Sequence, residues 1–318
     1  MSDLVTFGET RVRLSPPQGS RLSRVDQFDV HVGGAESNVA VAASALGTET
    51  TWLSALPETA LGERIAHALR GEGVDPRVTW TPDGRVGTYY FEPGGDPRGA
   101  TVVYDRTGTP MRDVTPDDLA VDAVRDATLC FTSGITPALS DQAAATTESL
   151  LATAQEAGAT TTLDVNYRSK LWTQAEARET LVDLFEHVEL LFVAERDARN
   201  VLDGDGDGEA IARTLASTYD FDTVVVTRGE AGALAVSDGV VCEQPAFETD
   251  TIDPVGSGDA FVGGYLARHL DGESVSEALR WGAATAALKR TLAGDMATIS
   301  ASEIRAVLQQ DGRDSIDR

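Results

Sequence analysis

The sequence predicts an α/β protein with a mostly parallel central sheet that is covered by helices on both faces. Short apolar segments with strand character alternate with longer helical segments along most of the 318 residues, and this alternation is typical of parallel sheets. A hydrophobic content of 42% is enough for a large core, and the length fits a single domain over residues 1–318. Ligands of such sheets bind beyond the carboxyl ends of the strands.

Six short apolar segments predict buried strands. The expected strands are Leu4–Phe7, Thr51–Ser54, Leu129–Thr132, Thr160–Leu163, Leu190–Val193 and Thr223–Thr227. Helical patterns follow or separate these strands. The expected helices are Glu36–Leu46, Leu61–Gly71, Gln142–Ala157, Glu176–His187, Gly208–Tyr219, Asp259–Leu270, Val275–Thr291 and Ser302–Gln309.

Two regions, about 11–32 and about 78–105, interrupt the alternation. They are rich in β-type residues, turns and aromatic residues, and they have no helical period. On the residues alone, these regions are either β-rich insertions or irregular surface loops.

The run Asp250–Gly264 combines a glycine turn, a helix start and a carboxylate. Gly256 and Gly258 allow the backbone to approach a ligand closely, and the N–H groups at a helix start form an anion site. Asp259 lies in the first turn, where it can take a proton from a hydroxyl group that attacks a bound phosphoryl group. Taken alone, a Gly-x-Gly-Asp run is more often only a tight turn with an N-terminal cap.

A second glycine pair, Gly33-Gly34, opens the alanine-rich helix that carries Asn38. In this order along the chain, the two segments resemble the two signature motifs of the ribokinase (PfkB) family of carbohydrate kinases. The resemblance implies a three-layer αβα sandwich with a small β-sheet lid, formed by residues about 11–32 and 78–105 and often shared within a homo-oligomer. It also implies ATP and Mg²⁺, and it leaves a monovalent cation such as K⁺ open.

By the same resemblance, the glycine turn and its surroundings form the site of phosphoryl transfer. Asp259 is expected to be the catalytic base. The backbone N–H groups expected to bind the γ-phosphate charge are those of Gly256, Ser257 and Gly258. The cofactor-binding residues expected next to the nucleotide are Thr227, Gly229 and Gly232, together with Gly256 and Gly258.

Two carboxylates are candidates for Mg²⁺ binding through water. Asp253 matches an Asp of the family motif. The alternatives are that it holds water around the metal, that it orders the loop, or that it is a plain turn residue. The family often carries Asn-x-x-Glu after the strand that ends here at Val193, whereas this chain has Ala194-Glu-Arg-Asp197. Asp197 therefore stands in place of the Glu, and Glu195 is the alternative.

The acceptor is predicted to be a sugar acid. Arg168 follows an expected strand and Arg106 comes from the second β-rich region, and arginines bind carboxylates through charge-assisted, bidentate bonds that a neutral sugar does not need. These segments resemble those of 2-keto-3-deoxygluconate kinases. The substrate contacts that the resemblance implies are Gly33, Gly34, Asn38, Tyr89, Tyr104, Arg106, Arg168 and Asp295.

The expected reaction is ATP-dependent phosphorylation of the terminal hydroxyl group of 2-keto-3-deoxygluconate, with the galactonate-derived acid not distinguished. A fructokinase is the alternative, because fructokinases share the Asp-x-Asn-x-Arg stretch that begins at Asp164. A sugar- or nucleotide-sensing binding protein is a second alternative, although such a protein needs no base at Asp259. A dinucleotide-dependent dehydrogenase would carry Gly-x-Gly-x-x-Gly after the first strand, and the residues that follow Phe7 do not.

The charge is strongly negative, with 26 basic and 51 acidic residues and a formal net charge of −25. Such a surface repels nucleic acid and anionic membranes. The N-terminus has no signal-peptide pattern, and no apolar run approaches the roughly 20 residues that cross a bilayer, so we expect a cytoplasmic protein. The charge predicts adaptation to high salt, where self-repulsion is screened, and an acidic partner site is the alternative.

From this charge we predict that the protein needs high salt for stability. In dilute salt, about 0.1 M, the screening distance is about 10 Å, so repulsion among the 51 carboxylates should loosen the fold. Thermal melting in about 0.1 M and about 2 M KCl measures the effect, and we expect the higher melting temperature at the higher concentration. An equal or higher melting temperature in dilute salt would contradict the interpretation.

Overall fold

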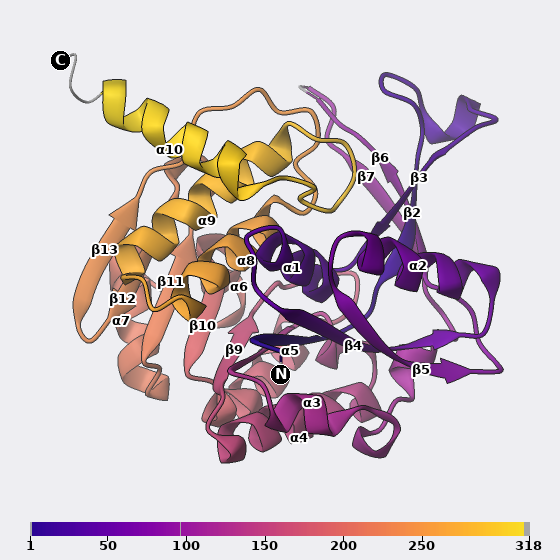
Figure 1. Cartoon of the computed structure of the whole chain (residues 1–318), viewed down its shortest axis with the longest axis horizontal. Helices are drawn as coiled ribbons and strands as arrows, with labels where there is room; N and C mark the ends of the chain where they lie inside the picture. The colour runs from indigo at the N-terminus through magenta and orange to yellow at the C-terminus, as the bar shows by residue number, and fades with distance from the viewer. Residues whose placement is uncertain (1, 96, 315–318) are drawn as a thin grey trace.

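A computed structural model describes residues 2–95 and 97–314, and within them a nine-stranded sheet forms the centre of the molecule (Figure 1). Its order is β13-β12-β11-β10-β9-β8-β1-β4-β5. The strands from β11 to β5 in this order are parallel, and β12 and β13 add an antiparallel hairpin. The strands are β1 (Leu4–Phe7), β4 (Thr50–Pro57), β5 (Asp75–Thr81), β8 (Leu129–Ser133), β9 (Thr160–Asp164), β10 (Leu190–Ala194), β11 (Thr223–Thr227), β12 (Ala233–Ser237) and β13 (Val240–Gln244).

Helices cover both faces of this sheet. One layer holds α1 (Ala35–Ser44), α2 (Ala60–Gly71), α8 (Ser257–Leu270), α9 (Val275–Arg290) and α10 (Ala301–Asp314). The other holds α3 (Val121–Arg125), α4 (Asp141–Ala157), α5 (Gln174–Leu184), α6 (Glu195–Val201) and α7 (Gly208–Tyr219). Strand side chains alternate between the layers: in β11, Val225 packs with the first layer, and Val224 and Val226 pack with the second. This is the predicted αβα sandwich.

A second, four-stranded sheet has the order β3-β2-β6-β7 and projects from the body of the molecule (Figure 1). Its strands are β2 (Arg11–Ser15), β3 (Asp29–Gly33), β6 (Thr88–Glu92) and β7 (Thr101–Asp105). The pair β2–β6 is parallel, and the two outer pairs are antiparallel. The small sheet is therefore built from the two regions expected to be β-rich.

The structure differs from the expected elements in three places. Residues 78–81 belong to β5 of the large sheet, so only part of the region 78–105 forms the small sheet. Pro76 lies in this strand, which is possible because β5 is at the sheet edge. The hairpin β12–β13 and the helices α3 and α6 were not among the expected elements, because these segments are too short to show a clear period.

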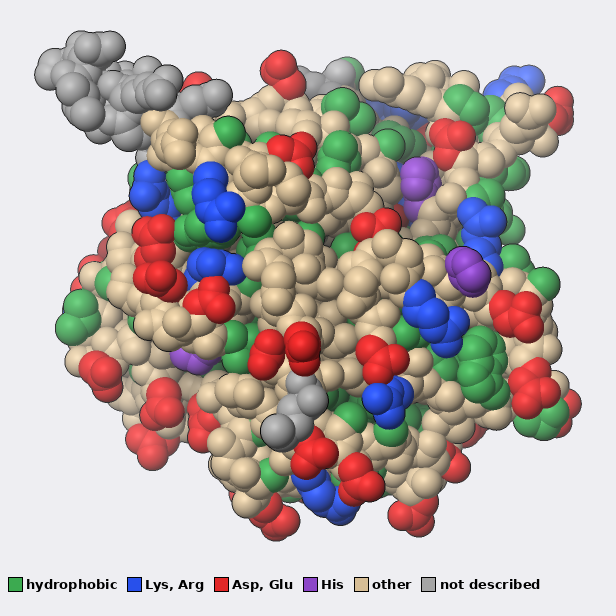
Figure 2. All heavy atoms as spheres, in the orientation of Figure 1, with side chains coloured by type: hydrophobic (Ala, Val, Ile, Leu, Met, Phe, Trp, Pro, Cys, Tyr) green, Lys and Arg blue, Asp and Glu red, His purple; other side chains and the backbone are tan. Residues whose placement is uncertain are grey.

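Acidic residues are scattered over the face of the molecule that Figure 2 shows, and they are not gathered in one patch. This distribution favours a generally solvated acidic surface over a single acidic partner site. In the described part of the chain, no helix is long and apolar enough to cross a membrane.

Two glycines bring α8 close to its neighbours. A Cβ atom on Gly263 would lie 2.6 Å from the Val39 carbonyl oxygen and from the Ala42 Cβ atom, both in α1. A Cβ atom on Gly264 would lie 2.4 Å from the Thr285 Oγ1 atom in α9. Close packing therefore explains both glycines, and it sets the position of α8 against α1.

We predict that Gly263→Ala lowers the free energy of unfolding by about 1–3 kcal/mol, because the added methyl group meets backbone that cannot move away. Gly71→Ala is the matched control, since Gly71 lies at the end of α2 and nothing lies within 4 Å of the added methyl group. There the better helix propensity of Ala should raise stability by up to about 1 kcal/mol. Denaturant unfolding in high salt measures both, and a Gly263→Ala protein as stable as the wild type would show that the helices can separate freely.

Candidate active site

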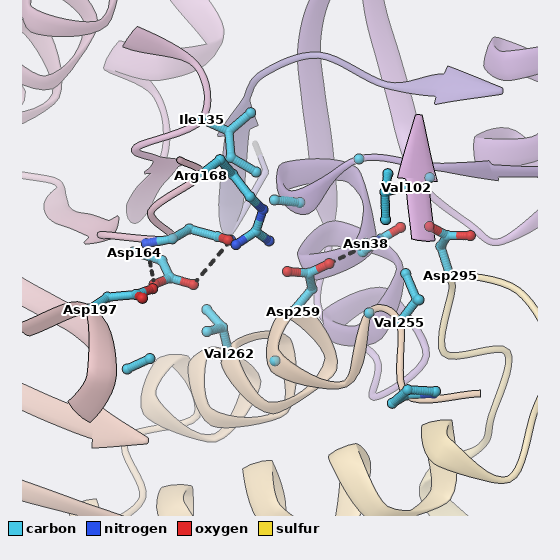
Figure 3. Close-up of a pocket in the computed structure, with 18 of the residues that line it drawn as sticks. Asn38, Val102, Ile135, Asp164, Arg168, Asp197, Val255, Asp259, Val262 and Asp295 are labelled. Carbon is cyan, nitrogen blue, oxygen red and sulfur yellow. Dashed lines mark hydrogen bonds between the residues drawn. The ribbon is translucent and has the colours of Figure 1, made fainter. Parts of the chain in front are cut away.

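A pocket of about 400 Å³ lies between the small sheet, the ends of α1 and α8 and the carboxyl ends of the parallel strands. Asp164 and Thr227, the last residues of β9 and β11, line it, as expected for a sheet of this kind. Figure 3 shows Asp259 in the middle of this pocket, with Asp164, Arg168 and Asp197 to one side and Asp295 to the other. Segments far apart in the sequence thus meet at one cavity.

The predicted glycine turn is present at the N-terminus of α8. Gly256 is the N-cap residue with a φ of 82°, and a Cβ atom there would lie 2.0 Å from the Asp295 carbonyl oxygen. Only glycine fits such a position. The first N–H groups of the helix have no partner within it, and Gly256 and Gly258 line the pocket at this point. The turn is therefore suited to binding an anion.

Asp259 lies in the first turn of α8 and is half-buried. Its Oδ2 atom accepts a hydrogen bond of 2.7 Å from the Nδ2 atom of Asn38 (Figure 3). Burial raises the pKa of Asp259 to about 6, although the bond from Asn38 and the charge of Arg168 lower it. The carboxylate is therefore ionised at neutral pH and able to accept a proton.

Two further carboxylates lie near Asp259. Asp164 ends β9, and Asp197 lies buried in the first turn of α6. Burial, together with the charges of Asp259 and Asp197, raises the pKa of Asp164 to about 8 against the opposing charge of Arg168. Asp164 was given no role on the sequence, although its position at the carboxyl end of an expected strand is one where ligands bind.

The carboxylates of the pocket do not converge on one point. Of the residues that the structure describes, the one trio of His, Cys, Asp or Glu with ligand atoms within 4.8 Å of one another is the exposed Glu148, Glu186 and His187. Asp164, Asp197 and Asp259 therefore surround a space in which a cation would be bound partly through water.

Asp253 is held in a buried network beside the pocket. Its carboxylate accepts hydrogen bonds from the Nη2 atom of Arg13 at 2.7 Å, from the Val255 N–H at 3.0 Å and from the Gly294 N–H at 3.1 Å. Arg13 also donates to Asp295 at 3.2 Å, and the Tyr89 hydroxyl group donates to the same carboxylate. These bonds favour the loop-ordering alternative for Asp253, and Arg13 is a residue that sequence analysis missed.

The predicted substrate residues are mostly together in the pocket. Those that line it are Gly33, Gly34, Asn38, Tyr89, Tyr104, Arg168 and Asp295. Arg106 is not among its described lining residues, because its guanidinium group is paired with the buried Glu9. Arg11 lines the pocket instead, and sequence analysis gave it no role.

A second cavity of about 290 Å³ adjoins the first, and Thr227, Pro254 and Gly258 line both. Gly229, Gly232 and Ser257 line the second cavity. Gly232 has a φ of 87°, and a Cβ atom there would lie 2.1 Å from the Gln244 carbonyl oxygen. The remaining wall is largely apolar and includes Phe247, Phe261, Ala283, Ala286 and Ala287. Such a wall suits a flat aromatic base.

The chain is similar to kinases along its whole length. Residues 1–302 match the family described as pfkB family carbohydrate kinase. The chain is 54% identical over 317 residues to a Haloferax volcanii protein named 2-dehydro-3-deoxygalactonokinase. This match covers 100% of this chain and 99% of that protein. It is 30% identical over 298 residues to a Thermoproteus tenax 2-dehydro-3-deoxygluconokinase, and the match covers 93% of this chain and 90% of that protein. The crystal structure of a Thermotoga maritima 2-dehydro-3-deoxygluconokinase matches with a TM-score of 0.91 and 32% identity, over 96% of this chain and 99% of that one.

Proposed function

Because this chain belongs to the pfkB family of carbohydrate kinases, we propose that it phosphorylates the terminal hydroxyl group of a 2-keto-3-deoxy sugar acid with ATP. The observation that carries the proposal is the position of Asp259 at the N-terminus of α8. There it lines a cavity with arginines and tyrosines, and its neighbour Gly258 lines both that cavity and a largely apolar one. One cavity suits the acid, the other suits the nucleotide, and the base lies where they meet.

In this proposal Asp259 takes the proton of the attacking hydroxyl group as the new O–P bond forms. ATP, when bound, supplies the γ-phosphoryl group and leaves as ADP. The N–H groups of Gly256, Ser257 and Gly258 donate hydrogen bonds to the negatively charged γ-phosphate, and the helix dipole of α8 also stabilises this charge. Asn38 orients Asp259 through its hydrogen bond.

The residues around the second cavity bind the nucleotide in this proposal. Thr227, Gly229 and Gly232 form its polar side, and the positive φ of Gly232 allows the backbone to pass close to the ligand. Mg²⁺ would be held by Asp197 and Asp164 through water, since a divalent cation offsets the burial and the carboxylate repulsion that raise the pKa of Asp164. Asp253 fits this role less well, because both of its oxygens already accept hydrogen bonds.

The acceptor is proposed to be an acid because cations line the sugar end of the pocket in a protein with a net charge of −25. Arg168 is half-buried there and lies close enough to lower the pKa of Asp164 and Asp259. The relatives carry the names of both the gluconate-derived and the galactonate-derived acid. Of the two acids, the galactonate-derived one is preferred, because the chain is 54% identical in sequence to the 2-dehydro-3-deoxygalactonokinase.

The small sheet is proposed to act as the lid of the sugar cavity and as a contact between subunits. Tyr89 and Tyr104, from β6 and β7, line the cavity. Val30 and Val103, from β3 and β7, are 41% and 50% exposed. Exposed apolar residues on a sheet are typical of a surface that another subunit covers. Closure of the lid would exclude water, which otherwise competes as the phosphoryl acceptor.

We predict that ADP release in high KCl is fastest with 2-keto-3-deoxy sugar acids when a panel of sugar acids, ketoses and nucleosides is offered. We expect the galactonate-derived acid to have the higher kcat/KM of the two epimers. The measurement is coupled ADP release, followed by chemical identification of the phosphorylated carbon atom. A preference for fructose would replace the proposal with a fructokinase, and binding without any ADP release would favour a sensing protein.

We predict that Asp259→Asn lowers kcat by roughly 10²–10⁴-fold, because the amide keeps the shape of the side chain and cannot take the proton. The amide oxygen can still accept the hydrogen bond from Asn38, so KM for both substrates should change little. Steady-state kinetics and the rise in Tm with each ligand separate catalysis from binding. If the variant keeps more than about half of the wild-type kcat, general-base catalysis by this residue is wrong.

A further inference from the structure

Arg11, in β2 of the small sheet, lines the sugar cavity and is only 8% exposed. Its Cζ atom lies 4.8 Å from the ring centroid of Tyr89 and 5.1 Å from that of Tyr104. Gly87 packs against its aliphatic part, since a Cβ atom on Gly87 would lie 2.9 Å from the Arg11 Cγ atom. The guanidinium group is therefore held in place on several sides by side chain and backbone.

The charges around Arg11 do not balance. Glu9 is the nearby carboxylate, and its Oε2 atom accepts a hydrogen bond from Arg106 while lying 3.8 Å from the Arg11 Nε atom. Two arginines thus share one glutamate. In the neighbouring network, Arg13 and Lys289 balance Asp253 and Asp295. Within the group of Arg11, Arg106 and Glu9, one buried positive charge is left over.

The donors of Arg11 are also unused. Among the residues described by the structure, its Nε and Nη1 atoms have no hydrogen-bond partner. A buried charge without a partner is strongly destabilising, and so is a buried donor without an acceptor. Both costs disappear when an anion enters the cavity and accepts these hydrogen bonds.

We infer that Arg11 binds the carboxylate of the acceptor and is a specificity-determining residue of this chain. The inference rests on the proposed function and adds a residue that sequence analysis did not assign. Arg106, by contrast, donates directly to Glu9, although its Nε atom also has no partner among the described residues, and it joins the β7 end of the small sheet to the end of β1. A neutral ketose would leave the charge of Arg11 uncompensated, so the same residue selects against it.

A purely structural role for Arg11 is the alternative. Stacking of a guanidinium group over Tyr89 and Tyr104 is stabilising by itself, and removal of a side chain with that role lowers the stability of the free protein. Removal of an uncompensated buried charge raises the stability of the ligand-free protein. The stability of the ligand-free protein and KM for the acid therefore separate the two roles.

The test uses Arg11→Met and Arg11→Gln in the full chain, at high salt. Met keeps the length of the side chain and its contact with the aromatic rings, and Gln keeps an N–H donor without the charge. Arg85→Met is the matched control, because it removes an exposed arginine paired with Asp105 beside the same sheet. The readouts are kcat and KM for a 2-keto-3-deoxy sugar acid, KM for ATP, and Tm with and without the acid in the absence of ATP.

We expect both Arg11 variants to raise KM for the acid by about 10- to 150-fold, the range of a lost charge-assisted hydrogen bond. KM for ATP and kcat should stay close to the wild type, the Tm of the ligand-free protein should not fall, and the rise in Tm caused by the acid should disappear. Arg85→Met should behave as the wild type in each respect.

Other results would contradict the inference. If the wild type phosphorylates the acid and the folded variants keep KM within about threefold, or keep the rise in Tm, the inference is wrong while the proposed function stands. A lower Tm without a change in KM assigns the structural role. If the wild type acts only on neutral sugars, the proposed function fails first, and the inference fails with it.

Discussion

The ion pairs of Arg13 are the interaction on which the rest of the site depends. Its guanidinium group binds Asp253, 240 positions away in the chain, and Asp295, 282 positions away. It thereby joins the small sheet to the segment before α8 and to the loop after α9. Loss of one partner of such a buried pair costs about 3–5 kcal/mol, because the other charge is left buried. The two ends of the pocket keep their relative position through this contact.

The packing of α1 against α8 links the fold to the chemistry. Gly263 allows the two helices to approach closely, and this approach brings Asn38 of α1 within 2.7 Å of Asp259 of α8. The hydrogen bond fixes the carboxylate at the helix N-terminus, where phosphate charge would also be attracted. Burial in the same place raises the pKa of Asp259 to about 6, nearer to the value that suits a base at neutral pH. A packing contact thus sets both the geometry and the basicity of one side chain.

Local features of the sequence were enough to predict the αβα sandwich and the glycine turn at Gly256. Hydrophobic periodicity and turn propensity depend on residues that are close together in the sequence. The partners of Arg13 and Arg106 were not predictable in this way. Their ion pairs join residues from different parts of the chain, and only the folded arrangement decides which carboxylate each arginine meets. The edge strand β5 was placed in the wrong sheet for a related reason, since its composition fits either sheet and its pairing with β4 is a tertiary contact. The roles of individual site residues stay predictions until kinetics test them.

The net charge of the surface and the charge of Arg11 in the pocket have opposite signs, and salt affects them differently. The net charge of −25 arises from residues that are mostly solvated, so high salt screens their repulsion of an anionic substrate. Arg11 is only 8% exposed, and interactions of buried charges are screened much less. In the proposed function, a sugar acid would approach the screened surface at high salt while the buried Arg11 would still bind its carboxylate. An acidic protein that binds an anion needs this separation, because an exposed arginine would lose most of its attraction in the salt that keeps the surface stable.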